Sequence, residues 1–88
     1  MVSDFNDVVV SGIDVGKDSK KAIVSLEGGG LDAGWYKISD DHESSFLAMV
    51  TVFNTAIVGN KKVTVNFSGS FSGQGSTNES IEQVVMPG

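Results

Sequence analysis

Few side chains in this sequence could perform acid–base or nucleophilic chemistry. The densest group of titratable residues is Asp40, Asp41, His42 and Glu43, which could form an acid–base or metal cluster. We interpret it instead as the beginning of a helix, where carboxylates interact favourably with the helix dipole. Ser-His-Asp catalysis needs a histidine held between a carboxylate and a nucleophile, and nothing in the sequence supports that geometry for His42. We therefore predict that the protein is not an enzyme.

Motifs for metals, thiols and phosphates are incomplete. The chain has no cysteine, which excludes disulfides, thiol catalysis and cysteine-bound zinc. Asp14, Gly16 and Asp18 match a fragment of a calcium loop, but the bidentate glutamate of that loop is absent. The three glycines at 28–30 lack the Lys-Ser/Thr pair that completes a phosphate-binding loop. We expect no cofactor and no metal.

Side chains suited to binding a polar ligand are more frequent. Trp35 and Tyr36 could stack on a sugar, or one could fill the core while the other lies at an edge. Ser11 could contact a glycan as donor and acceptor, or be an ordinary strand serine beside a bulge. The segment 68–78 is rich in hydroxyls and amides and is either a recognition loop or a connector. The candidate ligand-binding residues are Ser11, Trp35, Tyr36, Asn66 and Ser68.

The charge of the chain limits the classes of molecule that we expect it to bind. The 88 residues carry eleven acidic side chains and six lysines, no arginine, and a net charge of −5. Nucleic-acid binding needs a basic surface and favours arginine, and anionic membranes attract basic segments. We expect no nucleic acid as a partner and no insertion into a membrane.

The N-terminal residues carry no secretion signal. Residues 1–7 include Asp4 and Asp7 and lack the apolar stretch of a signal peptide. The longest uncharged stretch, 44–60, contains polar residues and is better explained by a helix of a soluble protein than by a membrane span. We expect a secreted or periplasmic protein whose leader was removed, with a cytoplasmic protein as the alternative.

Apolar periodicity predicts strands over 8–15, 21–27, 35–39, 63–67 and 81–86, with one helix over about 41–58. Gly12 lies inside the first strand, where a glycine often marks a bulge or bend. Residues 16–20 are predicted to form a polar turn, and 28–34 a flexible connection. We expect Asp40 to cap the helix and Gly59 to end it in the left-handed conformation.

This order of elements predicts a mainly β fold with one helix (α+β). Three strands, a helix and two strands is the order of an OB-fold, a five-stranded β-barrel. A bend at Gly12 would let the first strand serve both sides of the barrel. We expect 1–88 to be a single domain, because a chain of this length supports one core. Residues 1–7 would be a disordered or extended N-terminal segment.

The predicted helix has an unusual second face. Its core stripe is ordinary and consists of Phe46, Met49, Val50, Phe53, Ala56 and Ile57. The opposite side should be charged, yet no charged residue occurs between Glu43 and Lys61. We predict that this side packs against another copy of the chain; the alternative is a weakly polar, solvated surface. The outer helix face, as we name it, consists of Leu47, Ala48, Thr51, Val52, Thr55 and Val58.

Several of these segments resemble a known family. The run VVVSGI at 8–13, the strand at 23–28 and the segment FLAMVTVFNTAIVGNKKVTVNF at 46–67 are similar to receptor-binding B subunits of bacterial AB toxins. The pattern is nearest to the subtilase-cytotoxin B subunit and its stand-alone relatives. The likeness extends over about residues 8–86. It implies an OB-fold, secretion, ring-shaped homo-oligomers with helices lining a central pore, and binding of cell-surface glycans.

The resemblance also has consequences for single residues. Ser11 matches the serine that contacts sialic acid in subtilase-type subunits. Phe67 stands where those subunits have a tyrosine that helps to hold the sugar, so sialic acid itself is not implied. We expect a small secreted, non-enzymatic domain that self-associates and binds a glycan. The alternative is a structural or interaction subunit that binds a protein partner and no sugar.

Overall fold

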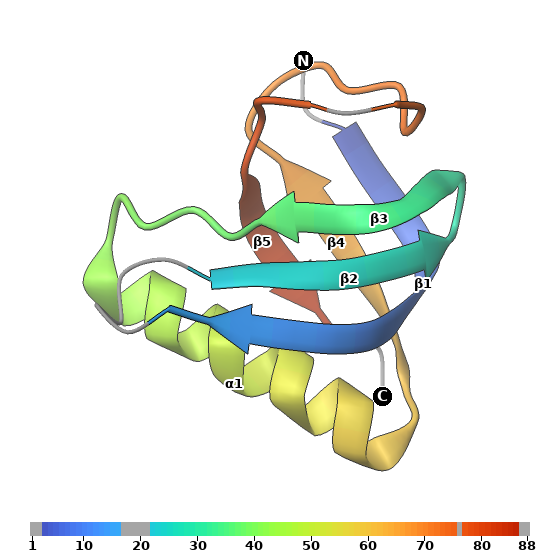
Figure 1. Cartoon of the computed structure of the whole chain (residues 1–88). Helices are drawn as coiled ribbons and strands as arrows, with labels where there is room; N and C mark the ends of the chain where they lie inside the picture. Colours follow the sequence, from blue (N-terminus) through green and yellow to red (C-terminus); the bar gives the residue numbers. More distant parts are fainter. Residues whose placement is uncertain (1–2, 17–21, 76, 87–88) are drawn as a thin grey trace.

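The computed structural model of the chain describes residues 3–16, 22–75 and 77–86. In them the chain forms five strands and one helix (Figure 1). The elements are β1 (Ser3–Val15), β2 (Ala22–Gly28), β3 (Leu31–Lys37), α1 (Glu43–Gly59), β4 (Lys62–Phe67) and β5 (Ile81–Val85). The predicted mainly β fold with one helix is confirmed. The polar turn predicted after β1 lies outside the described residues, apart from Gly16.

All five strands belong to one antiparallel sheet, with the order β3-β2-β1-β4-β5. Alternating burial along β2 and β4 gives these strands a core side. In β2, for example, Ala22, Val24 and Leu26 are buried while Ile23 and Ser25 between them are partly exposed. The longest strand, β1, lies in the middle and pairs with β2 on one side and β4 on the other.

Two irregularities bend β1. Its register with β2 shifts between Val10 and Gly12, so the bulge predicted at this glycine is confirmed. Its register with β4 shifts between Phe5 and Val8, where Asp7 has a positive φ of 58°. Bulges increase local twist. The two halves of β1 therefore run in different directions and serve differently oriented parts of the sheet, as Figure 1 shows.

The edge strands β3 and β5 approach each other without closing the sheet. They meet at a single parallel bridge between Ile38 and Ile81, beside which the Ser39 N–H donates to the Ile81 carbonyl at 2.9 Å. The chain then turns away toward α1. The closed barrel expected from the sequence is therefore not confirmed, because one point of contact replaces a ladder between the two edges.

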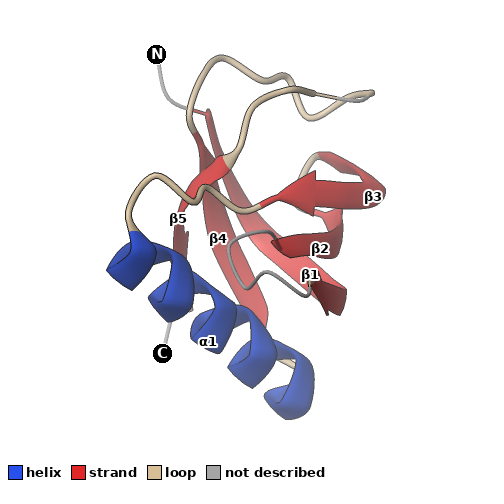
Figure 2. Cartoon of the chain, turned by 60° about the vertical axis from the view of Figure 1, so that its left-hand side comes forward, coloured by secondary structure: helices blue, strands red, loops and turns tan. Residues whose placement is uncertain are grey.

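The helix α1 covers one end of the curved sheet (Figures 1 and 2). It buries Phe46, Met49, Phe53 and Ala56, and the partly buried Val50 and Ile57 pack against the same core. The core stripe predicted for the helix is therefore confirmed. Burial of these side chains, rather than intrinsic helix propensity, supplies most of the stability of such a helix.

The loop 68–80 covers the opposite end. Its Phe71 is buried against Phe5, Tyr36 and Phe67, and the ring centroids of these contacts lie 5.1–5.9 Å apart. These separations and tilted planes are the favoured geometry of aromatic pairs. The loop is held in place from β3, because the Asp32 N–H donates to the Gly73 carbonyl. The segment is therefore part of the core as well as a connection.

Two strands begin earlier than predicted. β1 begins at Ser3 because Phe5 is buried in the core, so the described part of the N-terminal segment is extended. β3 begins at Leu31, which is also buried and pairs with Gly28. The flexible connection expected over 28–34 is therefore wrong. A tight turn at residues 29 and 30 joins β2 and β3.

Both predicted helix caps are also wrong. His42 is the N-cap residue and makes no side-chain cap hydrogen bond, whereas Asp40 was expected in that role. The contact of Ser39 with β5 fixes the chain just before Asp40, and the helix begins only at Glu43. At the other end, Asn60 adopts the left-handed conformation, with φ 53° and ψ 48°, in place of Gly59. Asparagine is the usual substitute for glycine there.

Candidate functional site

Three neighbouring strands place a tryptophan and two serines on one exposed side of the sheet. Gly12 of β1 lies opposite Ser25 of β2, and Ser25 lies opposite Trp35 of β3. Residues that lie opposite each other in a sheet project to the same side. Ser11, next to the bulge, is directed to this side as well, since its hydroxyl contacts that of Ser25. We name Ser11, Gly12, Ser25 and Trp35 the Trp35 face.

Trp35 is the large aromatic residue of this surface. It is 56% exposed. A Cβ atom placed on Gly12 would lie 3.5 Å from Cη2 of Trp35, so the indole extends across β2 to the backbone of β1. The exposed part of the indole contributes no burial energy to folding. An indole in this position can instead contribute its apolar body and its polar N–H to a ligand.

The two serines provide hydrogen-bonding groups next to the indole. Oγ of Ser11 lies 2.8 Å from Oγ of Ser25 and 3.2 Å from the Ser25 carbonyl oxygen. Each hydroxyl has one proton and two lone pairs. If Ser11 donates to the Ser25 hydroxyl, the latter still has its own proton to donate, and both oxygens can accept. The pair can therefore exchange hydrogen bonds with a ligand hydroxyl in either direction.

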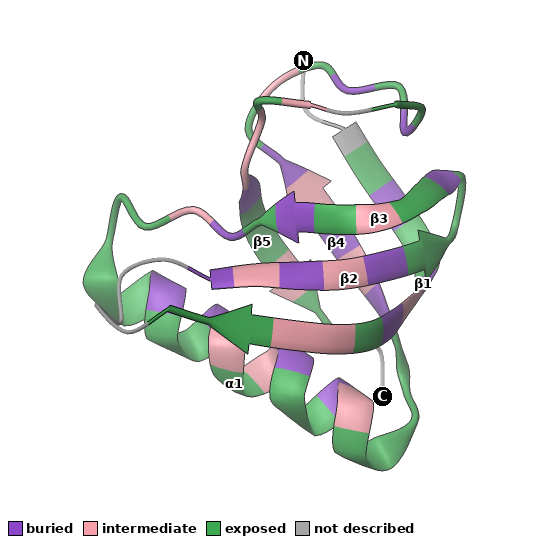
Figure 3. Ribbon diagram, viewed as in Figure 1, coloured by how far each residue is buried: buried purple, intermediate pink, exposed green. Residues whose placement is uncertain are grey.

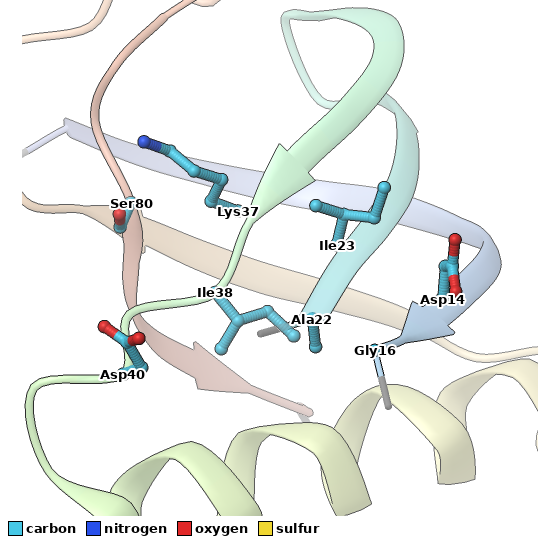
Figure 4. A pocket seen from close by; sticks show the side chains of 8 residues that line it. All are labelled: Asp14, Gly16, Ala22, Ile23, Lys37, Ile38, Asp40 and Ser80. Atoms are coloured by element: carbon cyan, nitrogen blue, oxygen red, sulfur yellow. The ribbon is translucent and has the colours of Figure 1, made fainter. Parts of the chain in front are cut away.

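A cavity of about 520 Å³ adjoins the Trp35 face. It is lined by Asp14, Gly16, Ala22, Ile23, Lys37, Ile38, Asp40 and Ser80. Figure 4 shows the apolar side chains in its middle, Asp14 at one end, and Lys37, Asp40 and Ser80 toward the gap between β3 and β5. Asp14, Ile23 and Lys37 are the neighbours two positions along β1, β2 and β3 from Gly12, Ser25 and Trp35. The two surfaces are therefore continuous.

A second hollow, of about 300 Å³, lies between β3 and the loop 68–80. It is lined by Asp32, Ala33, Gly34, Trp35, Tyr36, Gly75 and Thr77. The Asp32 carboxylate accepts a 2.8 Å hydrogen bond from the Gly75 N–H, which joins the loop to β3 at this point. Trp35 therefore borders a recess to which two segments distant in sequence contribute.

Tyr36, the other predicted aromatic, borders the second hollow, but its ring is in the core and it does not belong to the Trp35 face. Its ring packs between Phe67 and Phe71, and its hydroxyl donates to the Asp32 carbonyl. Burial, and secondly the charge of Asp32, raise the pKa of Tyr36 above its ordinary value of 10.0. The phenol is therefore neutral at physiological pH and serves the fold.

Asn66 and Ser68 lie apart from the Trp35 face, on the β4 side of β1. The Asn66 amide donates to the Asp4 carboxylate. The Ser68 hydroxyl donates to the Glu79 carboxylate at 2.7 Å and accepts from the Ser80 N–H at 3.2 Å. Both side chains thus already have protein partners. Of the predicted ligand-binding residues, the structure brings Ser11 and Trp35 together and separates them from the other three.

Ser25 was missing from the residues predicted from the sequence. The alternation of β2 places it on the outer side of the strand, but this is true of any polar residue in that strand. Its position between Ser11 and Trp35 depends on two strand registers and on the bulge before Gly12. These registers could not be derived from the sequence alone.

The outer helix face is largely exposed, as Figure 3 shows along α1. Leu47 is 52% and Val58 86% exposed. The Thr51 hydroxyl donates to the Leu47 carbonyl at 3.0 Å, and that of Thr55 donates to the Thr51 carbonyl at 2.9 Å. Because these protons are directed to the helix backbone, the threonines are less polar toward solvent than their type suggests. The single chain therefore leaves an apolar, uncharged surface uncovered.

Two further classes of site, for a metal ion and for a membrane, concern the described residues 3–16, 22–75 and 77–86. No group of three or more His, Asp or Glu side chains there is placed to hold a metal ion. No helix in this part of the chain combines the length and the apolar character that a membrane span needs.

Comparison of the chain with protein-family models, with curated proteins and with solved structures finds no match. The resemblance to toxin B subunits therefore depends on the sequence features given above and stays a prediction. The geometry of the Trp35 face and of the outer helix face is the main support for a function.

Proposed function

We propose that this chain is a small, non-enzymatic domain that binds glycans through the Trp35 face and self-associates through the outer helix face. The observation that supports glycan binding most directly is the position of the exposed Trp35 beside the Ser11–Ser25 hydroxyl pair. An indole packs against the C–H groups of a sugar ring, while hydroxyls exchange hydrogen bonds with those of the sugar. No catalytic group is needed for this function.

We also propose that the open sheet is an OB-type barrel. The strand order, the helix between β3 and β4, and the parallel bridge Ile38–Ile81 between the two edges all fit such a barrel, which is often only partly closed. OB-folds bind oligosaccharides and oligonucleotides on the β2–β3 face and on the adjoining loops. Ser25 and Trp35 lie on that face, and Thr77 of the β4–β5 loop lines the recess beside Trp35.

Charge favours a glycan over a nucleic acid as the ligand. The net charge is −5 and there is no arginine. A nucleic acid needs basic groups along its phosphates, and several stacked aromatics are typical of single-strand binding. Trp35 supplies one such ring, whereas Tyr36 beside it is buried. A glycan with hydroxyl groups suits this surface better.

The outer helix face supports self-association. A helix side without charge that exposes Leu47 and Val58 is typical of a surface that another molecule covers. The toxin-like sequence segments agree with an oligomer and with a secreted or periplasmic protein, since cell-surface glycans are met outside the cytoplasm. The alternative function is an interaction subunit that binds a protein partner and no sugar.

The proposed function is tested with a glycan array on the wild-type protein and on Trp35→Ala. We expect binding to a defined set of glycans and a loss of at least about tenfold in affinity for Trp35→Ala, which corresponds to roughly 1.4 kcal/mol of lost contact. The matched control is Val85→Ala, which removes another exposed apolar side chain, 47% exposed, from β5.

Binding by Trp35→Ala equal to that of the wild type would overturn the assignment of the site. An array without binding above background would overturn the glycan proposal and favour the protein-partner alternative. Tight binding of single-stranded DNA in a parallel filter assay would contradict the argument from charge.

A further inference from the structure

We infer that the second copy packs on the outer helix face in an antiparallel orientation, with a two-fold axis close to Thr51. This inference rests on the self-association proposed above and adds its geometry. It differs from the ring implied by the toxin resemblance. A closed two-fold pair uses the same surface on both copies.

An uncharged line of residues, most of them small, runs along the outer helix face and is extended toward the start of the helix by Ser44. Ser44, Leu47, Thr51, Thr55 and Val58 follow one another at intervals of three or four residues, so they lie along one side of α1. Residues of this line are exposed, and the two threonine hydroxyls are bonded to the helix backbone. Side chains as small as threonine let two helices approach closely, within the usual interaxial distance of about 8–10 Å.

Charges of opposite sign lie at the two ends of the helix. Asp40, Asp41 and Glu43 are at its beginning, Lys61 and Lys62 follow its end, and all five are exposed. No charged residue lies between Glu43 and Lys61. The surface is therefore acidic at one end, neutral along its length and basic at the other.

This charge pattern selects the orientation of the second copy. In a parallel pair, acidic ends would meet each other and lysines would meet lysines. In an antiparallel pair, the acidic end of each copy meets the lysines of the other, which is complementary at both ends. Like-charge contacts therefore disfavour the parallel orientation.

The same pattern fixes the register. The acidic residues and the lysines are about equally distant in sequence from Thr51, which is also the midpoint between Ser44 and Val58. A two-fold axis near Thr51 therefore places Ser44 of one copy beside Val58 of the other. It also places Leu47 beside Thr55, so that larger and smaller side chains alternate across the contact.

The contact is small. A helix of 17 residues is about 25 Å long, and one side of it covers less than the roughly 800 Å² per partner of a standard interface. We therefore expect an association that depends on protein concentration and is not permanent. Because opposite charges contribute, added salt should weaken it.

The test uses the absence of cysteine from the chain. Ser44→Cys and Val58→Cys are prepared with tags of different mass, mixed in equal amounts and oxidised. We expect the mixed disulfide between Ser44→Cys and Val58→Cys to predominate. Predominance of disulfides between two identical variants, or failure of any pair to cross-link while light scattering shows a dimer, would overturn the antiparallel geometry.

Charge reversal provides an independent measurement. Lys61→Glu with Lys62→Glu should weaken dimerisation at least about tenfold in sedimentation analysis. Adding Asp40→Lys, Asp41→Lys and Glu43→Lys to that variant should restore it. An equal affinity of all three proteins would contradict the charge argument.

The outcomes separate this inference from the proposed function. A protein that is monomeric at millimolar concentration would overturn both the self-association and its geometry. A dimer cross-linked between identical positions would overturn the geometry alone. Neither result affects glycan binding at the Trp35 face, which lies on the sheet.

Discussion

The Ser11 hydroxyl on β1 donates a 2.8 Å hydrogen bond to the Ser25 hydroxyl on β2. The bond bridges the bulge at which β1 changes its register, and it places both hydroxyls beside the indole of Trp35. A polar pair next to an exposed aromatic ring is the arrangement on which the glycan proposal depends. The first prediction therefore concerns these serines.

Removing a hydroxyl from the pair should weaken ligand binding without unfolding the domain. We expect Ser25→Ala to lower the affinity for a bound glycan by about 3–10-fold, since one hydrogen bond contributes about 0.5–1.5 kcal/mol. Titration calorimetry measures the affinity. Ser72→Ala, at an exposed position in the loop 68–80, is the control, and an equal loss in both variants would contradict a specific role for Ser25.

Alanine substitutions at two apolar residues of α1 should have different effects, one on the stability of the monomer and the other on dimerisation. Phe53 is fully buried and Leu47 is on the outer helix face. Phe53→Ala should lower the free energy of unfolding by about 3–5 kcal/mol because it leaves a cavity. Leu47→Ala should change the free energy of unfolding of the monomer by less than about 0.5 kcal/mol. It should nevertheless weaken dimerisation. Urea unfolding at low protein concentration separates these effects, and a large loss of monomer stability in Leu47→Ala would show that this side chain belongs to the core.

The loop 68–80 approaches the β2–β3 turn too closely for a side chain at Gly73. This residue has a φ of 88°, and a Cβ atom on it would lie 2.4 Å from the Gly30 carbonyl oxygen. Gly73→Ala should therefore lower the unfolding free energy by more than the roughly 1–2 kcal/mol that a left-handed conformation alone costs. Gly75, with φ 79° and open space around it, is the matched control. Equal thermal destabilisation of Gly73→Ala and Gly75→Ala would contradict the close contact.

Tyr36 should make stability depend on pH under alkaline conditions. Burial, and then the charge of Asp32, raise its pKa in the folded state above 10.0. The unfolded chain thus loses the phenol proton first, and the free energy of unfolding falls as the pH rises above about 10. Tyr36→Phe should be less stable than the wild type at pH 7, by about 1 kcal/mol for the lost hydrogen bond, but should lose less stability between pH 9 and 11. If the free energy of unfolding fell by the same amount in both proteins between pH 9 and 11, this account would be contradicted. All other ionisable groups are the same in both proteins, so the comparison isolates Tyr36.

The sequence predicted the elements better than their ends. The core stripe of α1 was evident because its apolar residues recur at helical spacing. The start of β1 was not, because burial of Phe5 depends on contacts with Phe67 and Phe71 from distant segments. The start of the helix differs for a similar reason: the contact of Ser39 with β5 fixes the chain before the helix. Local propensity could not anticipate these long-range contacts.

The candidate site was only partly predictable. Trp35 and Tyr36 are adjacent, and strand alternation requires that they face opposite sides, but it does not determine which one enters the core. Ser11 could be singled out because it precedes Gly12. Its neighbour Ser25 became evident only from the pairing of β1 with β2. Strand registers decide which side chains are close together, and they depend on the whole sheet.

The most direct test of the central claim follows the indole N–H signal of Trp35 in an NMR titration with a glycan from the array. The chain has a single tryptophan, so this signal is unambiguous. We predict that it shifts together with the backbone amides of Ser11 and Ser25, while those of Asn66 and Val85 change little. A bound glycan that leaves the Trp35 indole and both serines unchanged would contradict the account.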